Sequence, residues 1–97
     1  MEILVVESDP GESGALAAFL KGRGHAPLTA DGFASAAKLV KRHAPGLVLF
    51  NADGQPSKGL EFLDVVGELG APPPVIVIAQ RATPEDAVRT MKHGAHD

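Results

Sequence analysis

The chain has 97 residues, 44% of them hydrophobic and 22% charged, which is typical of one soluble globular domain and leaves no room for a second. Its net charge of −3 and its lack of Tyr and Trp argue against a nucleic-acid-binding surface, and its lack of Cys excludes a disulfide scaffold and a thiolate zinc site. No apolar run is long enough for a signal peptide or a membrane span, so we expect a cytoplasmic protein.

Three short segments are continuously apolar rather than alternating, which is the pattern of strands buried on both faces of a sheet. These segments are residues 3–6, 47–50 and 75–78. A more polar segment, residues 26–30, contains Pro27, which cannot donate a hydrogen bond to a neighbouring strand. We therefore expect this fourth strand at an edge of the sheet.

The segment after the first strand carries the start signals of a helix. Asp9 suits the N-cap, Pro10 suits the first helical position, and Glu12 stands three residues after Asp9, as in a capping box. Gly22 and Gly24 are expected to end this helix. Its buried stripe would consist of Leu16, Phe19 and Leu20. We expect all four phenylalanines of the chain to lie in the core.

Three further segments have helical periodicity and helix-end signals. They cover residues 33–43, with Asp31 as the expected cap, residues 59–69, and residues 83–94. Strands and helices thus alternate along the chain, which predicts an α/β doubly wound fold with a parallel sheet and helices on both faces. In such a fold the side chains at the carboxyl ends of the strands form the ligand site.

Several motifs point in register to one signalling family. An acidic residue follows the first strand, Asn51 follows the apolar core of another, Gly59 comes eight residues later, and residues 94–97 form a Gly-Ala-His-Asp turn. These motifs resemble those of bacterial response-regulator receiver domains of the CheY-like type, and the likeness extends over the whole chain. The resemblance implies a flavodoxin-like sheet in the strand order 2-1-3-4. It also implies that residues 1–97 form one receiver-like domain that ends before the family's fifth strand and last helix.

The resemblance further implies which positions would form a phosphorylation site, and the chain departs from the family at several of them. Asn51 stands where the family has its phosphoacceptor Asp, so the shape of the site remains but the nucleophile is lost. Ser8 replaces a carboxylate that binds Mg²⁺, and Ala79 replaces a Thr or Ser hydroxyl. Three losses together argue against a single engineered substitution. The acids that remain as weak Mg²⁺ ligands are Glu7, Asp9 and Asp53.

These departures predict a pseudo-receiver, a non-enzymatic domain that signals without phosphorylation and without a cofactor, by binding a protein or a second copy of itself. In the family the surface near the fourth helix binds partners, and the candidate residues here are Arg89, Lys92 and His93. An exposed edge at the strand of residues 75–78 would be covered by the rest of a longer receiver, by self-association or by another protein. A longer chain would carry a C-terminal output domain. Two alternatives stay open: a working phosphoacceptor domain with an atypical or engineered site, using Asp53, and a small-molecule sensor.

Overall fold

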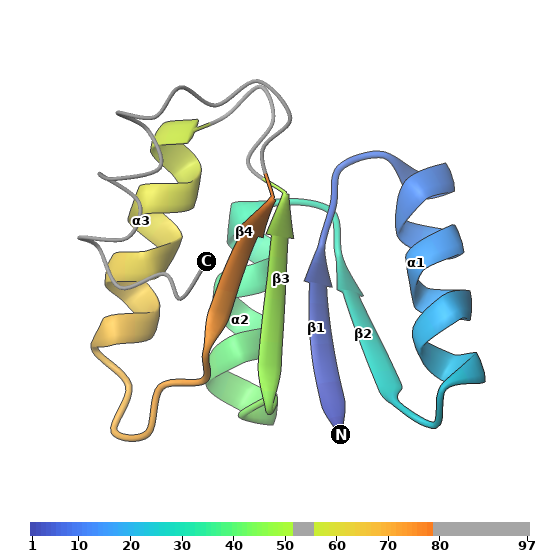
Figure 1. Cartoon of the computed structure of the whole chain (residues 1–97). Helices are drawn as coiled ribbons and strands as arrows, with labels where there is room; N and C mark the ends of the chain where they lie inside the picture. Colours follow the sequence, from blue (N-terminus) through green and yellow to red (C-terminus); the bar gives the residue numbers. More distant parts are fainter. Residues whose placement is uncertain (52–55, 79–97) are drawn as a thin grey trace.

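The computed structural model describes residues 1–51 and 56–78. The elements within these ranges are β1 (Glu2–Val6), α1 (Pro10–Gly22), β2 (Ala26–Ala30), α2 (Phe33–His43), β3 (Leu47–Asn51), α3 (Pro56–Gly67) and β4 (Val75–Ile78). The strands pair in parallel in the order β2-β1-β3-β4 (Figure 1). This confirms the predicted α/β fold, the strand order and the edge position of β2. The helix expected over residues 83–94 lies outside the described residues.

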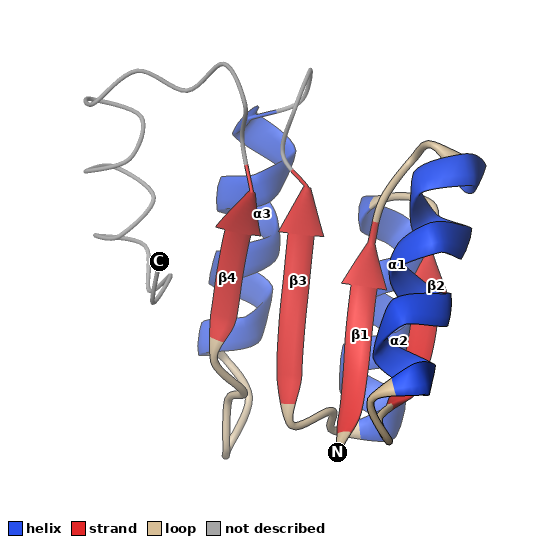
Figure 2. Ribbon diagram, turned by 45° about the vertical axis from the view of Figure 1, so that its right-hand side comes forward, coloured by secondary structure: helices blue, strands red, loops and turns tan. Residues whose placement is uncertain are grey.

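The sheet has helices on both faces, and β1 runs through its middle. Leu4 and Val6 of β1 belong to a core cluster beneath α2 and α3, whereas Ile3 and Val5 pack with Leu20 of α1 on the opposite face. Among the described helices, Figure 2 shows α1 in front of the sheet and α2 and α3 behind it. Because both faces of β1 are covered, its sequence is apolar without alternation.

The larger cluster lies between the sheet and the helices α2 and α3. At its centre the ring centroids of Phe50 and Phe62 are 5.0 Å apart, and Phe62 is fully buried. The other buried members of this cluster are Leu4, Val6, Ala30, Ala36, Val40, Val48, Leu63, Val66 and Val75. Most of the apolar burial that stabilises the described part of the chain is therefore on this face.

The expected helix ends differ from the observed ones in the cap of α2 and at both ends of α3, which ends at Gly67 rather than at residue 69. Helix α3 begins at Pro56 rather than at residue 59. Proline suits the first position of a helix, because the N–H that it lacks would have no partner within the helix there. Helix α2 has Gly32 at its N-cap, with no side-chain cap. Asp31, the expected cap, instead accepts a hydrogen bond of 3.0 Å from the Ser35 hydroxyl. The Asp31 prediction was wrong because this carboxylate reaches a side chain of the helix rather than its backbone.

Phe19 of α1 was expected in the core, and this prediction was wrong. Its side chain is 57% exposed on the outer surface of the helix. The Arg23 guanidinium lies over the Phe19 ring, 4.9 Å from the ring centroid, and shields part of it from water. None of the described helices is long and apolar enough to cross a membrane.

Candidate functional site

The carboxyl ends of β1 and β3 bring two polar side chains together. Val6 of β1 is paired in register with Phe50 of β3, so the residues that follow, Glu7 and Asn51, lie side by side. The Asn51 side-chain amide donates a hydrogen bond to Glu7 Oε2. Both residues are half-buried, so this contact is only partly open to competition from water.

The second oxygen of the Glu7 carboxylate is also occupied. The backbone N–H of Asp9 donates to Glu7 Oε1 over 3.0 Å. The backbone of Glu7 is held as well, since its N–H donates to the carbonyl of Ala30 over 2.9 Å. A carboxylate that accepts hydrogen bonds at both oxygens has a fixed orientation and fewer lone pairs for any other ligand.

Asp9 caps the N-terminus of α1. Its Oδ1 accepts hydrogen bonds from the backbone N–H groups of Gly11, at 2.8 Å, and Glu12, at 3.2 Å. The predicted N-cap is confirmed. The full capping box is not formed, because the Asp9 N–H that Glu12 would accept donates instead to Glu7.

Replacing Asp9 tests this cap. Asp9→Ala is expected to lower the free energy of unfolding by about 1 kcal/mol, because two N–H groups of the first turn lose their acceptor. Urea denaturation followed by circular dichroism measures the change. Asp9→Asn is the matched control, since its amide oxygen still accepts and should retain most of the stability. Equal losses in the two variants would contradict the capping role.

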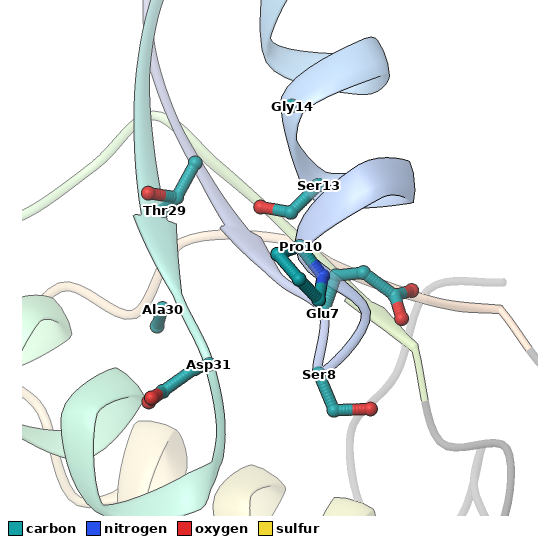
Figure 3. A pocket seen from close by; sticks show the side chains of 8 residues that line it. All are labelled: Glu7, Ser8, Pro10, Ser13, Gly14, Thr29, Ala30 and Asp31. Atoms are coloured by element: carbon teal, nitrogen blue, oxygen red, sulfur yellow. The ribbon is translucent and has the colours of Figure 1, made fainter.

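A pocket of about 300 Å³ lies beside this site, on its β2 side. It is lined by Glu7, Ser8, Pro10, Ser13, Gly14, Thr29, Ala30 and Asp31. Figure 3 shows the Ser13 hydroxyl directed toward Thr29, while the Glu7 carboxylate and the Ser8 hydroxyl point the other way. Neither Ser13 nor Thr29 belongs to a motif, so no sequence signal points to them.

The sequence of this chain matches one known family over almost its whole length. The model of the response regulator receiver domain family matches residues 3–97. This chain belongs to the response regulator receiver family. The receiver domain is 32% identical over 98 residues to the nitrogen assimilation regulatory protein NtrX of Azorhizobium caulinodans, in a match that covers 99% of this chain. It spans only 22% of the length of that relative.

Solved receiver structures have the same fold. A response regulator receiver protein from Pseudomonas putida superposes with a TM-score of 0.87 at 28% identity, covering 99% of this chain and 81% of that one. NtrX from Brucella abortus, solved in complex with ADP, superposes with a TM-score of 0.84 at 30% identity, covering 99% of this chain and 21% of NtrX. The chain is therefore a receiver domain of the two-component signalling type.

The receiver domain brings several of the predicted site residues to one edge of its sheet. Glu7 contacts both Asn51 and the backbone of Asp9, and Ser8 is exposed beside them. Among the described residues no three His, Asp or Glu side chains converge as a metal site would require. The predicted residues outside the described ranges are Asp53, Ala79, Arg89, Lys92 and His93.

Proposed function

We propose that this receiver domain signals without being phosphorylated, by binding a protein partner or a second copy of itself. The observation that carries the proposal is the hydrogen bond from the Asn51 amide to Glu7 at the carboxyl ends of β1 and β3. A side-chain amide has neither the charge nor the nucleophilic oxygen with which a carboxylate attacks a phosphoryl group. The residue at the centre of this edge therefore lacks the chemistry of a phosphoacceptor.

The neighbouring side chains also fit a Mg²⁺ ion poorly, and this supports the proposal. Mg²⁺ requires oxygen ligands in near-octahedral geometry and is usually held by one or two carboxylates. Here Glu7 accepts hydrogen bonds at both oxygens, and Asp9 Oδ1 caps α1. Ser8 offers a neutral hydroxyl in the same turn. A bound ion would have to displace these hydrogen bonds before it gained its ligands.

Without phosphorylation, signalling depends on the surfaces that the domain presents. On the strength of the family resemblance, Arg89, Lys92 and His93 are the residues proposed to contact a partner, which would carry acidic side chains to pair with them. NtrX, of which this chain matches 22%, is a much longer protein. An output domain in a longer regulator would be one such partner, acting in the cytoplasm.

Phosphoryl uptake is tested by mass. The protein is incubated with Mg²⁺ and acetyl phosphate, and its intact mass is followed by mass spectrometry. We expect no adduct of about 80 Da, the mass of one phosphoryl group. An adduct that persists would overturn the proposal. If Asp53→Asn then removed it, Asp53 would be the acceptor and the domain would be a working phosphoacceptor with an atypical site.

A further inference from the structure

The pocket between α1 and β2 contains a buried hydroxyl group. Ser13 of α1 is only 9% exposed, and its side chain is directed across the pocket toward Thr29 of β2 (Figure 3). A serine inside a helix often donates to the carbonyl four residues earlier, here that of Asp9. That carbonyl accepts the Ser13 backbone N–H, over 2.9 Å, but the Ser13 hydroxyl makes no hydrogen bond within the described residues. Because a buried hydroxyl gains stability from a hydrogen-bond partner, this one is available to a bound molecule.

The charges that line this pocket are all negative. They are the carboxylates of Glu7 and Asp31, and none of the lining residues is basic. Both carboxylates accept hydrogen bonds from neutral groups, Glu7 from the Asn51 amide and Asp31 from the Ser35 hydroxyl. Neither forms an ion pair with another described residue. A positively charged ligand would therefore be attracted to this pocket over roughly 8–10 Å, the distance at which salt screens exposed charges.

The remaining walls of the pocket are apolar, and the space is small. Pro10 and Gly14 line it on the side of α1, and Ala30 lines it on the side of β2 (Figure 3). Its volume of about 300 Å³ is at the lower end for pockets that bind small molecules. A ligand would therefore be short, with roughly six to ten non-hydrogen atoms and an aliphatic body. All of the lining residues lie between positions 7 and 31, from the end of β1 to the end of β2.

We propose that this pocket binds a short aliphatic amino alcohol. The ligand hydroxyl pairs with that of Ser13, which can donate or accept, and the methylene groups lie against Pro10 and Ala30. The ammonium group lies toward the strand ends, where Glu7 and Asp31 supply negative charge. This inference goes beyond the proposed function and does not rest on it, because Asn51 does not line the pocket and phosphoryl uptake is measured separately.

A series of probes with the same four-carbon body tests the two recognition features separately. Aminobutanol carries both groups, butylamine lacks the hydroxyl, butanediol lacks the charge, and hydroxybutyrate reverses the charge. The backbone amides of Gly14, Thr29 and Ala30 are followed by NMR while each probe is added at matched ionic strength. We expect aminobutanol to bind with a dissociation constant on the order of 1–10 mM, and butylamine and butanediol about tenfold more weakly. No saturable shift with aminobutanol up to about 50 mM, or equal binding of hydroxybutyrate, would overturn the proposal.

Ser13→Ala tests the hydroxyl contact. In this variant aminobutanol should lose its advantage, so that it and butylamine bind within about twofold of each other. A merely structural role of Ser13 would change the affinities of both probes equally and leave their ratio at about tenfold. The fold should be retained, because the hydroxyl makes no hydrogen bond within the described residues. An undiminished preference for aminobutanol would show that Ser13 does not bind the ligand hydroxyl.

Gly14→Met tests the place of binding. A Cβ atom at Gly14 meets nothing within 4 Å, and a helical side chain there extends back toward Pro10, along the wall of the pocket. We expect this variant to bind aminobutanol about tenfold more weakly or worse. Gly22→Met makes the same change at the other end of α1, where a Cβ also meets nothing within 4 Å, and should leave binding unchanged. Methionine forms helices better than glycine, so both variants should fold. Equal affinities of the two variants would overturn the assignment of this pocket.

Discussion

Asn51→Asp is expected to lower the free energy of unfolding by about 1–3 kcal/mol when no Mg²⁺ is present. The substitution replaces the amide that donates to Glu7 Oε2 with a second carboxylate at the same place. A hydrogen bond to a charged group is lost, and two like charges face each other in a half-buried position where water screens them incompletely. Urea denaturation of the two proteins in the presence of a chelator measures the difference.

The same variant should become more stable when Mg²⁺ is added. A divalent ion between two carboxylates relieves their repulsion, and a ligand that binds only the folded state raises stability in proportion to the logarithm of its concentration. The unmodified chain should not respond to about 10 mM Mg²⁺, nor should Glu7→Gln combined with Asn51→Asp, which has only one carboxylate there. An Asn51→Asp variant as stable as the parent in chelator would contradict the importance of the contact with Glu7.

Phe62→Ala is expected to cost about 3–5 kcal/mol of stability. Phe62 belongs to α3 and is fully buried. Its ring packs against that of Phe50 in β3, with 5.0 Å between the ring centroids. Removing the ring leaves a cavity in the larger core cluster, which the fixed strands β3 and β4 would fill only partly. Since the free energy of unfolding of a natural domain is about 5–15 kcal/mol, this loss is a large share of the total.

Phe19→Ala is the matched control for this core substitution. It removes the same ring from a position that is 57% exposed, so the folded state loses less buried apolar surface. We expect a cost below about 1 kcal/mol, mainly from the lost contact with the Arg23 guanidinium. Denaturation midpoints for both variants decide the matter. Equal costs for Phe62 and Phe19 would contradict the placement of the core.

The elements of the fold could be predicted from the sequence, because continuous apolar runs and helix-cap residues act locally. The predicted bounds of β4 coincide with the observed ones, whereas β1 and β3 each extend by one residue, to Glu2 and Asn51. These residues join the strands because partners lie opposite them: Glu2 faces Ala26 and Asn51 faces Ile78. Strand ends therefore depend on pairing between distant segments, which the apolar pattern alone does not contain.

Helix α1 illustrates a second limit. Residues 14–20 of this helix include no polar or charged side chain, so periodicity could not separate Leu20, which is buried, from Phe19, which is exposed. The cap was predictable because Asp9 and Pro10 are adjacent in the chain. Which side chains of α1 face away from the sheet depends on how the helix packs on the sheet, and local sequence does not determine that packing.

The predicted site residues that fall within the described ranges lie at one edge of the sheet, but their contacts could not be predicted. Glu7, Ser8 and Asp9 follow β1 and Asn51 ends β3, so the parallel order of the sheet brings them to one edge. The contact between Glu7 and Asn51 joins residues 44 positions apart, and the Asp9 N–H donates to Glu7 rather than to Glu12. Such choices depend on side-chain reach in three dimensions. The pocket beside the site, with Ser13 and Thr29, had no sequence signal for the same reason.

The most direct test of the central claim is to observe the Asn51 side-chain amide by NMR while Mg²⁺ is added. Its resonances are identified by their absence in Asn51→Asp. If the hydrogen bond to Glu7 closes this edge of the sheet to metal, the amide resonances should not move up to about 20 mM Mg²⁺. A saturable shift with a dissociation constant of a few mM or below would show that Mg²⁺ displaces Asn51 from Glu7. The account of an edge closed to metal would then be wrong, although Asn51 would still lack the nucleophilic oxygen of a phosphoacceptor.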